Sequence, residues 1–136
     1  MTPELTLQKA VRERLTSSAG VVDLVPADNI LDRNQRPNPD PSIIIGEGQS
    51  VDDDDSISRK LTRVVMDLHL WKKELSTQGV KALAGAIRST VNGGRLALDP
   101  GFHCVDCRVS SMRFLRDPDG ETSHGVVTIE ARVQEL

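Results

Sequence analysis

The hydrophobic period changes sharply between residues 61–71 and residues 75–91, and this change most constrains the fold. Residues two apart share one face of a strand, whereas residues three or four apart share one face of a helix. The first stretch alternates and predicts a strand; the second carries an unbroken apolar stripe and predicts a helix. The strand would bury Val64, Met66, Leu68 and Leu70 and present Val65, Asp67, His69 and Trp71 on its other face; the helix would bury Val80, Leu83, Ala84, Ile87 and Val91.

The N-terminal part of the chain predicts a helix and two short strands. Residues 4–18 have helical spacing, with Thr2 or Thr6 as the N-cap, Pro3 at the first position and Gly20 as the stop. A short apolar piece follows at residues 21–25. The prolines between residues 26 and 41 favour a loop with room for one short strand at residues 29–33. Three adjacent isoleucines predict a second strand over residues 42–48.

The C-terminal third predicts a long hairpin. Its strands cover residues 102–115 and 125–133, and the intervening sequence, residues 116–120, is typical of a turn. Val127, Ile129, Ala131 and Val133 are expected to face the core. In the first strand the apolar parity changes, and a bulge near Ser110 and Ser111 would bring Val105, Cys107 and Val109 and also Met112 and Phe114 into the core.

This element order predicts an α+β fold: a mostly antiparallel sheet with two helices packed on one face, in a single domain over residues 1–136. The chain has only two Phe, one Trp and no Tyr, so the core must be aliphatic. The opposite face of the sheet must then be solvated or covered by another chain.

Charge and hydropathy exclude several classes of function. With 17 basic and 20 acidic residues the formal charge is −3, which argues against a nucleic-acid-binding domain. No apolar run approaches the length of about 20 residues that a membrane span needs, and the N-terminus lacks a secretory pattern. We therefore expect no membrane association, a cytoplasmic site of synthesis and reduced cysteines.

The stretch from His103 to Cys107 contains residue types that bind metals or react as nucleophiles, but its pattern does not predict a metal site. Structural zinc requires four ligands, and only one cysteine pair is present. Strand parity predicts Cys104 and Cys107 on opposite faces, with His103 on the Cys107 face. We expect one buried and one half-exposed thiol. No catalytic motif surrounds any histidine, so we expect no enzyme and no cofactor; a small thiol enzyme remains an alternative.

The acidic run at residues 49–58 predicts a polar loop. Neighbouring carboxylates repel each other and gain nothing from burial, so the loop should be solvated and mobile. The spacing is not that of an EF-hand, which needs ligands at alternating positions and a central glycine. Its acidic residues are Asp52, Asp53, Asp54 and Asp55.

Val65, His69 and Trp71 lie on the less apolar face of the predicted strand 61–71. Tryptophan is enriched at the energetic centres of protein interfaces. The face is therefore a candidate interface, either between copies of this chain or in a monomeric adaptor that binds another protein. A loop or the N-terminal helix covering Trp71 is the other interpretation, and the sequence leaves both open.

Several segments, in order, resemble a family of tail-completion proteins from tailed bacteriophages, prophages and gene transfer agents. The resemblance covers nearly the whole chain, and the turn before the last strand is its most specific part. The 26–41 segment is unusually proline-rich for this family and the 47–58 loop unusually acidic. The matching segments are Leu7–Leu15, Ala19–Val25, Leu68–Trp71, the helix with Ala84, Ile87 and Arg88, Leu96–Leu98, Leu115–Gly120, and Thr122 to Arg132.

The resemblance implies a structural role with no catalytic residues. Proteins of this kind are similar to tail terminators: they form a ring, typically of six subunits, at the head-proximal end of the tail tube, after assembly in the bacterial cytoplasm. The ring contacts the major tail tube protein and the head-tail connector, and double-stranded DNA crosses its lumen without specific binding. For this chain we expect the Asp52–Asp55 loop at the lumen or between rings. We expect Arg113 and Arg116 at contacts across subunits, together with Val65, His69 and Trp71.

Overall fold

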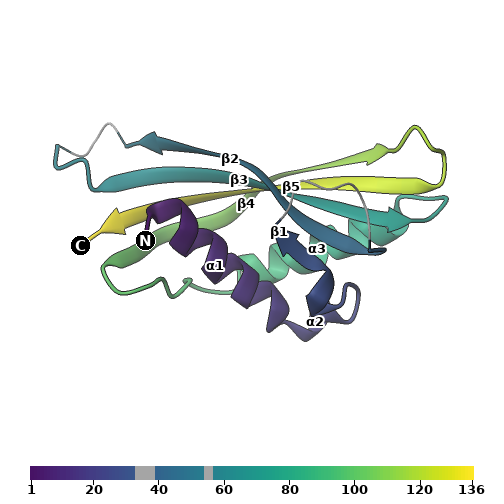
Figure 1. Ribbon diagram of the computed structural model, residues 1–136, viewed down its shortest axis with the longest axis horizontal. Helices are drawn as coiled ribbons and strands as arrows, with labels where there is room; N and C mark the ends of the chain where they lie inside the picture. Colours follow the sequence, from purple (N-terminus) through teal and green to yellow (C-terminus); the bar gives the residue numbers. More distant parts are fainter. Residues whose placement is uncertain (33–38, 54–56) are drawn as a thin grey trace.

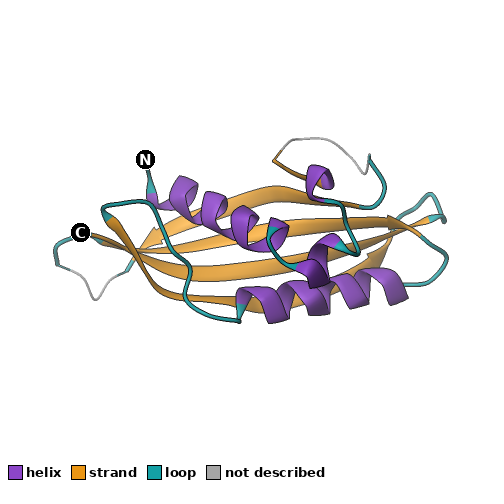
Figure 2. Ribbon diagram, turned by 90° about the horizontal axis from the view of Figure 1, so that it is seen from below, coloured by secondary structure: helices purple, strands orange, loops and turns teal. Residues whose placement is uncertain are grey.

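The computed structural model describes residues 1–32, 39–53 and 57–136, and it confirms the α+β fold. Two long helices pack on one face of a five-stranded sheet and leave the other face without a helical cover (Figures 1 and 2). The helices are α1 (Pro3–Thr16), the short α2 (Ala19–Val22) and α3 (Gln78–Val91), with a 3-10 turn at Ala27–Asn29. The strands are β1 (Ile30–Asp32), β2 (Ser42–Asp52), β3 (Leu61–Lys73), β4 (Phe102–Arg116) and β5 (Thr122–Glu135).

The strands lie in the order β1-β2-β3-β5-β4. β1 runs parallel to β2 over three residue pairs, and every other neighbouring pair is antiparallel. β3 and β5 are central and pair from Leu61 with Gln134 to Lys73 with Thr122. β1 and β4 are the edges of the sheet, and β1 accompanies only the first part of β2.

The core lies between the sheet and the helices and is aliphatic, as the sequence predicts. The alternation of β3 is confirmed, because Val64, Met66, Leu68 and Leu70 are all buried. The apolar stripe of α3 and the inward residues of β5 meet them there. The largest side chains with no exposure in this core include Leu7, Leu15, Ile30, Ile43, Leu68, Leu70, Ile87 and Ile129.

The two long helices begin near the predicted positions. Thr2 caps α1, since its Oγ1 accepts the Leu5 N–H at 3.3 Å, and Pro3 occupies the first turn. The prediction that Gly20 ends this helix is wrong: α1 ends at Thr16 and Gly20 lies inside α2. α3 begins at Gln78, three residues later than predicted, because the Glu74 carboxylate accepts the Gly79 N–H at 2.7 Å and holds residues 74–77 as a loop.

β4 contains two bulges, of which the sequence predicts one. The register against β5 shifts between Val109 and Ser111, as expected, and also between Cys104 and Asp106. The second shift corrects the predicted placement of the cysteines. Cys104 pairs with Val133 and Cys107 with Ala131, two inward-facing residues of β5, so both cysteines lie on the helix-covered face. His103 therefore faces away from both cysteines, and Val105 occupies the bulge and is exposed.

The predicted loop over residues 49–58 is partly strand. β2 continues to Asp52 and pairs with β3 as far as Thr62. The prediction that the acidic run is simply solvated is wrong at Asp53. Its carboxylate accepts hydrogen bonds from Arg132 Nε at 3.1 Å and Nη2 at 2.6 Å, and its side chain is only 16% exposed. Asp54 and Asp55 lie outside the described residues.

Candidate functional site

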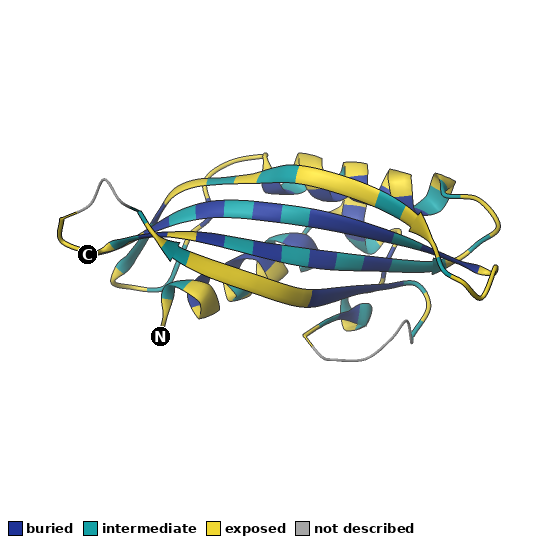
Figure 3. Ribbon diagram, turned by 90° about the horizontal axis from the view of Figure 1, so that it is seen from above, coloured by how far each residue is buried: buried dark blue, intermediate teal, exposed yellow. Residues whose placement is uncertain are grey.

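The helix-free face of the sheet carries the candidate site (Figure 3). Val65, His69 and Trp71 of β3 share this face, as predicted, and each is partly exposed. The β3–β5 register adds His124, which pairs with Trp71. The sequence did not predict this neighbour, because His124 follows a turn and is typical of a hairpin residue.

Three rings stack on this face; we call Trp71, His69 and His124 the Trp–His cluster. The Trp71 and His124 rings lie 3.8 Å apart between centroids and are inclined by only 3°. The His69 and His124 rings are 5.0 Å apart and inclined by 21°. Stacked rings restrict each other's orientation. The cluster is therefore a rigid, partly exposed aromatic surface rather than a set of free side chains.

A chain of hydrogen bonds runs from the cluster to β2. His69 Nε2 lies 2.8 Å from Glu47 Oε1, and His69 Nδ1 lies 2.8 Å from His124 Nε2. An ionised carboxylate only accepts, so His69 Nε2 carries a hydrogen and donates it to Glu47. The pKa of Glu47 is lowered by a backbone hydrogen bond and then by His69. Glu47 thus orients His69, which in turn orients His124.

His124 is held in its neutral form. Burial lowers the pKa of His124 to about 4, and the neighbouring His69 and Arg113 add to the effect, while Glu47 opposes it. A charged imidazolium here would lose hydration against the Trp71 ring and would face two cationic or potentially cationic groups. At neutral pH His124 is accordingly an uncharged ring stacked on Trp71, which suits contact with another protein.

This depressed pKa predicts a pH dependence of stability. The unfolded chain binds a proton at His124 near pH 6.5, whereas the folded chain binds it only near pH 4. The folded state should therefore lose stability as the pH falls from about 6.5 to about 4. We expect His124→Gln to reduce this loss in urea unfolding measured across that range. His103→Gln is the control for removing a histidine, and equal slopes for the two variants would contradict the prediction.

Two apolar side chains are buried beneath this face, which the sequence did not predict. Ile44 is 4% exposed and Val126 is 2% exposed, and neither belongs to the core between sheet and helices. Ile44 pairs with His69, and His69 pairs with Val126. The helix-free face therefore has a small apolar base of its own.

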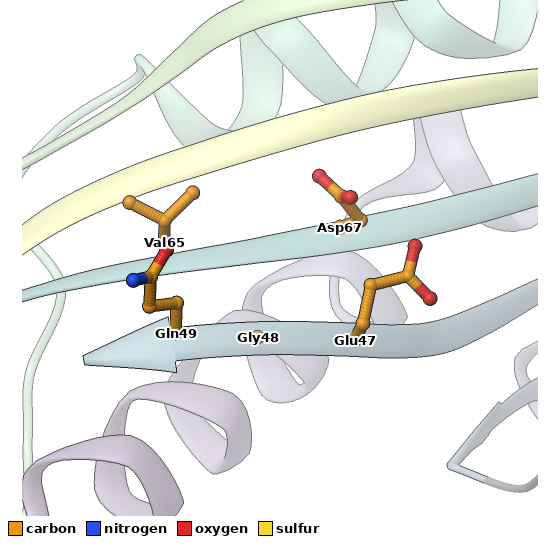
Figure 4. Close-up of a pocket in the computed structure, with 5 residues that line it drawn as sticks. All are labelled: Glu47, Gly48, Gln49, Val65 and Asp67. Atoms are coloured by element: carbon orange, nitrogen blue, oxygen red, sulfur yellow. The ribbon is translucent and has the colours of Figure 1, made fainter.

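Ion pairs occupy the other half of the face, beyond Val65. Glu130 lies 3.6 Å from Arg63 and 3.7 Å from Arg108, and Arg132 bonds Asp53 at 2.6 Å. Between this charged half and the Trp–His cluster lies an open pocket over β2 and β3, in which the Asp67 and Glu47 carboxylates stand above the strands (Figure 4). Asp67 accepts from Thr128 Oγ1 at 2.6 Å. The pocket is lined by Glu47, Gly48, Gln49, Val65 and Asp67.

Arg113 and Arg116 do not lie together. Arg113 pairs with Val126 and stands in the same cross-strand row as His69, so it belongs to the helix-free face. Arg116 shares its face with Phe114, which packs against the core beneath Lys81 of α3. The Arg116 Nη1 donates to the Leu75 carbonyl at 3.1 Å. Only Arg113 is therefore placed with Val65, His69 and Trp71.

Gly46 provides a way to test the rigidity of the cluster. A Cβ at this position would lie 2.5 Å from His69 Cδ2 and 2.7 Å from Nε2. His69 cannot yield without breaking its bond to Glu47 or its stack on His124, so Gly46→Ala should cost about 1–3 kcal/mol of unfolding free energy. Gly85→Ala, where a Cβ meets nothing within 4 Å in α3, should instead gain about 1 kcal/mol. Urea titrations of both variants check the signs, and a stable Gly46→Ala would refute the rigid cluster.

Within the described residues, no group of three or more His, Cys, Asp or Glu side chains is arranged to hold a metal ion. No helix among them has the length and apolar character to cross a membrane. The geometry offers aromatic, apolar and charged surface on one side of a thin sheet. A two-layer fold with an exposed face of this kind suits the class of proteins that work by contact with other chains.

The comparisons with known proteins specify this class. Residues 9–134 match the family "Tail completion protein gp17", so the chain belongs to that family. It is a structural tail completion protein and a virion component, and the thiol-enzyme alternative is excluded. Among solved structures it is similar to a chain of the "Virion of native gene transfer agent (GTA) particle", with 19% identity, a TM-score of 0.78 and 96% of each chain covered. That likeness shows a shared fold. No curated protein sequence matches.

Proposed function

We propose that this protein is the tail terminator: a ring, most simply of six copies, that caps the head-proximal end of the tail tube and joins it to the head connector. The observation that carries the proposal is the Trp–His cluster, a rigid aromatic surface that stays partly exposed in the folded chain. Its partner is a neighbouring copy. Membership of the tail completion family and the shared fold with a gene transfer agent virion chain support this role.

The two edges of the sheet suit a head-to-tail contact between copies. Among described residues, β2 has no outer strand beyond Ile45, and that stretch carries the exposed acidic residues Glu47 and Asp52. The β4 edge carries Arg108 and Arg113, and it exposes Val105, Met112 and Leu115. Two different edges of opposite charge form a heterologous contact, which closes into a ring when the rotation between copies allows it.

We place the acidic end of β2 at the lumen or between stacked rings. A lumen needs a surface that does not retain DNA, and phosphates are attracted by lysine and arginine. Asp53 is neutralised by Arg132, so Asp52 is the described residue that supplies free negative charge.

Asp52→Lys tests the lumen placement. It leaves the Asp53–Arg132 bond intact and should slow DNA delivery or leave DNA held in the particle. Delivery efficiency per particle measures this effect, with Asp52→Asn as the control for simple loss of charge. Normal delivery by the lysine variant would remove the lumen placement.

The role itself is tested by particles assembled without this protein. Electron micrographs should show overlong tails without heads, because nothing stops tube growth or connects the head. Supplying the protein in trans should restore tails of normal length. Tails of normal length that merely lack heads would argue for a joining role alone. Light scattering of the purified chain distinguishes a stable ring from a monomeric adaptor, provided that the ring forms without the tube.

A further inference from the structure

The bulge in β4 brings two cysteines together that strand parity would separate. With Val105 pushed out, Cys104 and Cys107 occupy adjacent inward positions opposite Val133 and Ala131. Both are free, Cys104 being buried and Cys107 partly exposed. The Cys104 thiol donates to the Asp106 carbonyl at 3.5 Å, and the two thiols lie close enough for each to change the pKa of the other. Both sulfur atoms therefore point into the same small space beside the bulge.

This space opens to solvent. A pocket of about 280 Å³ reaches the pair, and its walls come from the end of α3, from Gly94 and Arg95, and from β4. Arg95 is exposed at its rim. A pocket of this size admits a small thiol-bearing molecule. Arg95 and Asp106 both line it, so the pocket carries one positive and one negative group, and Arg95 is the group that attracts an anionic molecule.

The thiol pair releases its first proton at a lower pH than a single cysteine would. The hydrogen bond from Cys107 lowers the pKa of Cys104 to about 7, with Arg95 contributing. The same interaction and burial raise the pKa of Cys107. The pair thus loses one proton near neutral pH and retains the other, and a thiolate is the form that attacks disulfides.

We propose that Cys104 and Cys107 form a reactive dithiol that exchanges with low-molecular-weight disulfides and closes to an intrachain disulfide. The thiolate of the pair attacks one sulfur of the disulfide RSSR, forms a mixed disulfide and releases RS⁻. The second cysteine gives up its proton, attacks the protein sulfur of the mixed disulfide and releases another RS⁻. Two protein thiols are oxidised and one RSSR is reduced to two RSH.

Formation of the disulfide would hold the bulge in one conformation, together with the Val105–Asp106 segment next to Asn92 and Arg95. The Asn92 side chain accepts the Val109 N–H at 3.3 Å, so α3 and the edge strand are already joined at this point. The reaction does not depend on the terminator role, and it uses no residue of the Trp–His cluster.

The experiment uses the purified full chain with oxidised glutathione as the probe. After incubation near pH 7.5, the protein is denatured, alkylated and digested with trypsin, which releases residues 96–108 with both cysteines in one peptide. We expect this peptide to resist alkylation and to weigh two hydrogen atoms less than its reduced form. Reduced glutathione should reverse the change. Cys104→Ser and Cys107→Ser should each stop at the mixed disulfide with glutathione.

The rates of glutathione exchange distinguish a reaction that depends on the pocket from the ordinary reactivity of exposed thiols. Arg95→Gln should slow glutathione exchange several-fold, whereas Arg88→Gln on α3, whose side chain is not part of the pocket, should not. Alkylation of both cysteines after prolonged incubation would overturn the proposal. A mixed disulfide that persists in the unmodified sequence would overturn it as well, as would a disulfide between two chains on a non-reducing gel.

Discussion

Trp71→Ala is expected to convert the assembled ring into monomers that remain folded. Trp71 is partly exposed on the helix-free face and its ring lies flat on His124, so it is fixed in position before any partner arrives. Truncation of such an aromatic anchor commonly costs about 2 kcal/mol or more at an interface. In a ring the loss recurs at every contact, which is why a moderate change per contact should abolish assembly.

Light scattering during size-exclusion chromatography measures the result, and circular dichroism confirms that the monomer is folded. Leu24→Ala is the matched control, because Leu24 is 42% exposed but lies outside the helix-free face. It should assemble normally. A Trp71→Ala ring as resistant to dilution as the parent ring would show that this face is not the contact. Failure of assembly in the Leu24 variant as well would point to a general loss of stability.

Leu68→Ala is expected to lower the free energy of unfolding by about 2–5 kcal/mol. Leu68 has no exposure and lies in the central strand β3, between Ile45 of β2 and Val127 of β5. The neighbouring backbones are held by pairing on both sides, so the cavity cannot collapse, and the cost should lie toward the upper part of this range. Losses of this size are comparable to the total stability of many small domains.

Val65→Ala on the same strand provides the comparison for Leu68. Val65 faces the other side and is partly exposed, so its truncation should cost clearly less in the monomer. Urea unfolding at a protein concentration where both variants have the same oligomeric state gives the difference. Equal losses for the two variants would mean that the two faces of β3 are buried alike, contrary to the structure.

Most of the fold was predictable because its main elements have strong local periods. The alternation in β3 and the stripe in α3 each identify an element and its buried face without reference to the rest of the chain. The last part of β2, Gln49 to Asp52, was missed because this segment is mostly polar and has no such period. It is a strand only because the exposed edge of the long strand β3 offers it hydrogen-bond partners.

The site was predictable only in part. Val65, His69 and Trp71 were found because they alternate with core residues on one strand. His124 was missed because its contact with Trp71 depends on the β3–β5 register across the intervening helix and strand. The pairing of Cys104 with Cys107 was missed for a related reason. A bulge is defined by the partner strand, and the apolar pattern around Cys104 and Cys107 is equally compatible with regular parity.

The sequence by itself determined the main helices and strands, the apolar side of α3, β3 and β5, and that one face of the sheet lacks a helical cover. These properties follow from local spacing, since a helix and a strand bury different periodic sets of residues. The tertiary structure alone decided which side chains meet across the sheet: Trp71 with His124, His69 with Glu47, Asp53 with Arg132, and the two thiols with each other. Such contacts depend on register, and a shift of a single residue would exchange the two faces of a strand and disperse them all.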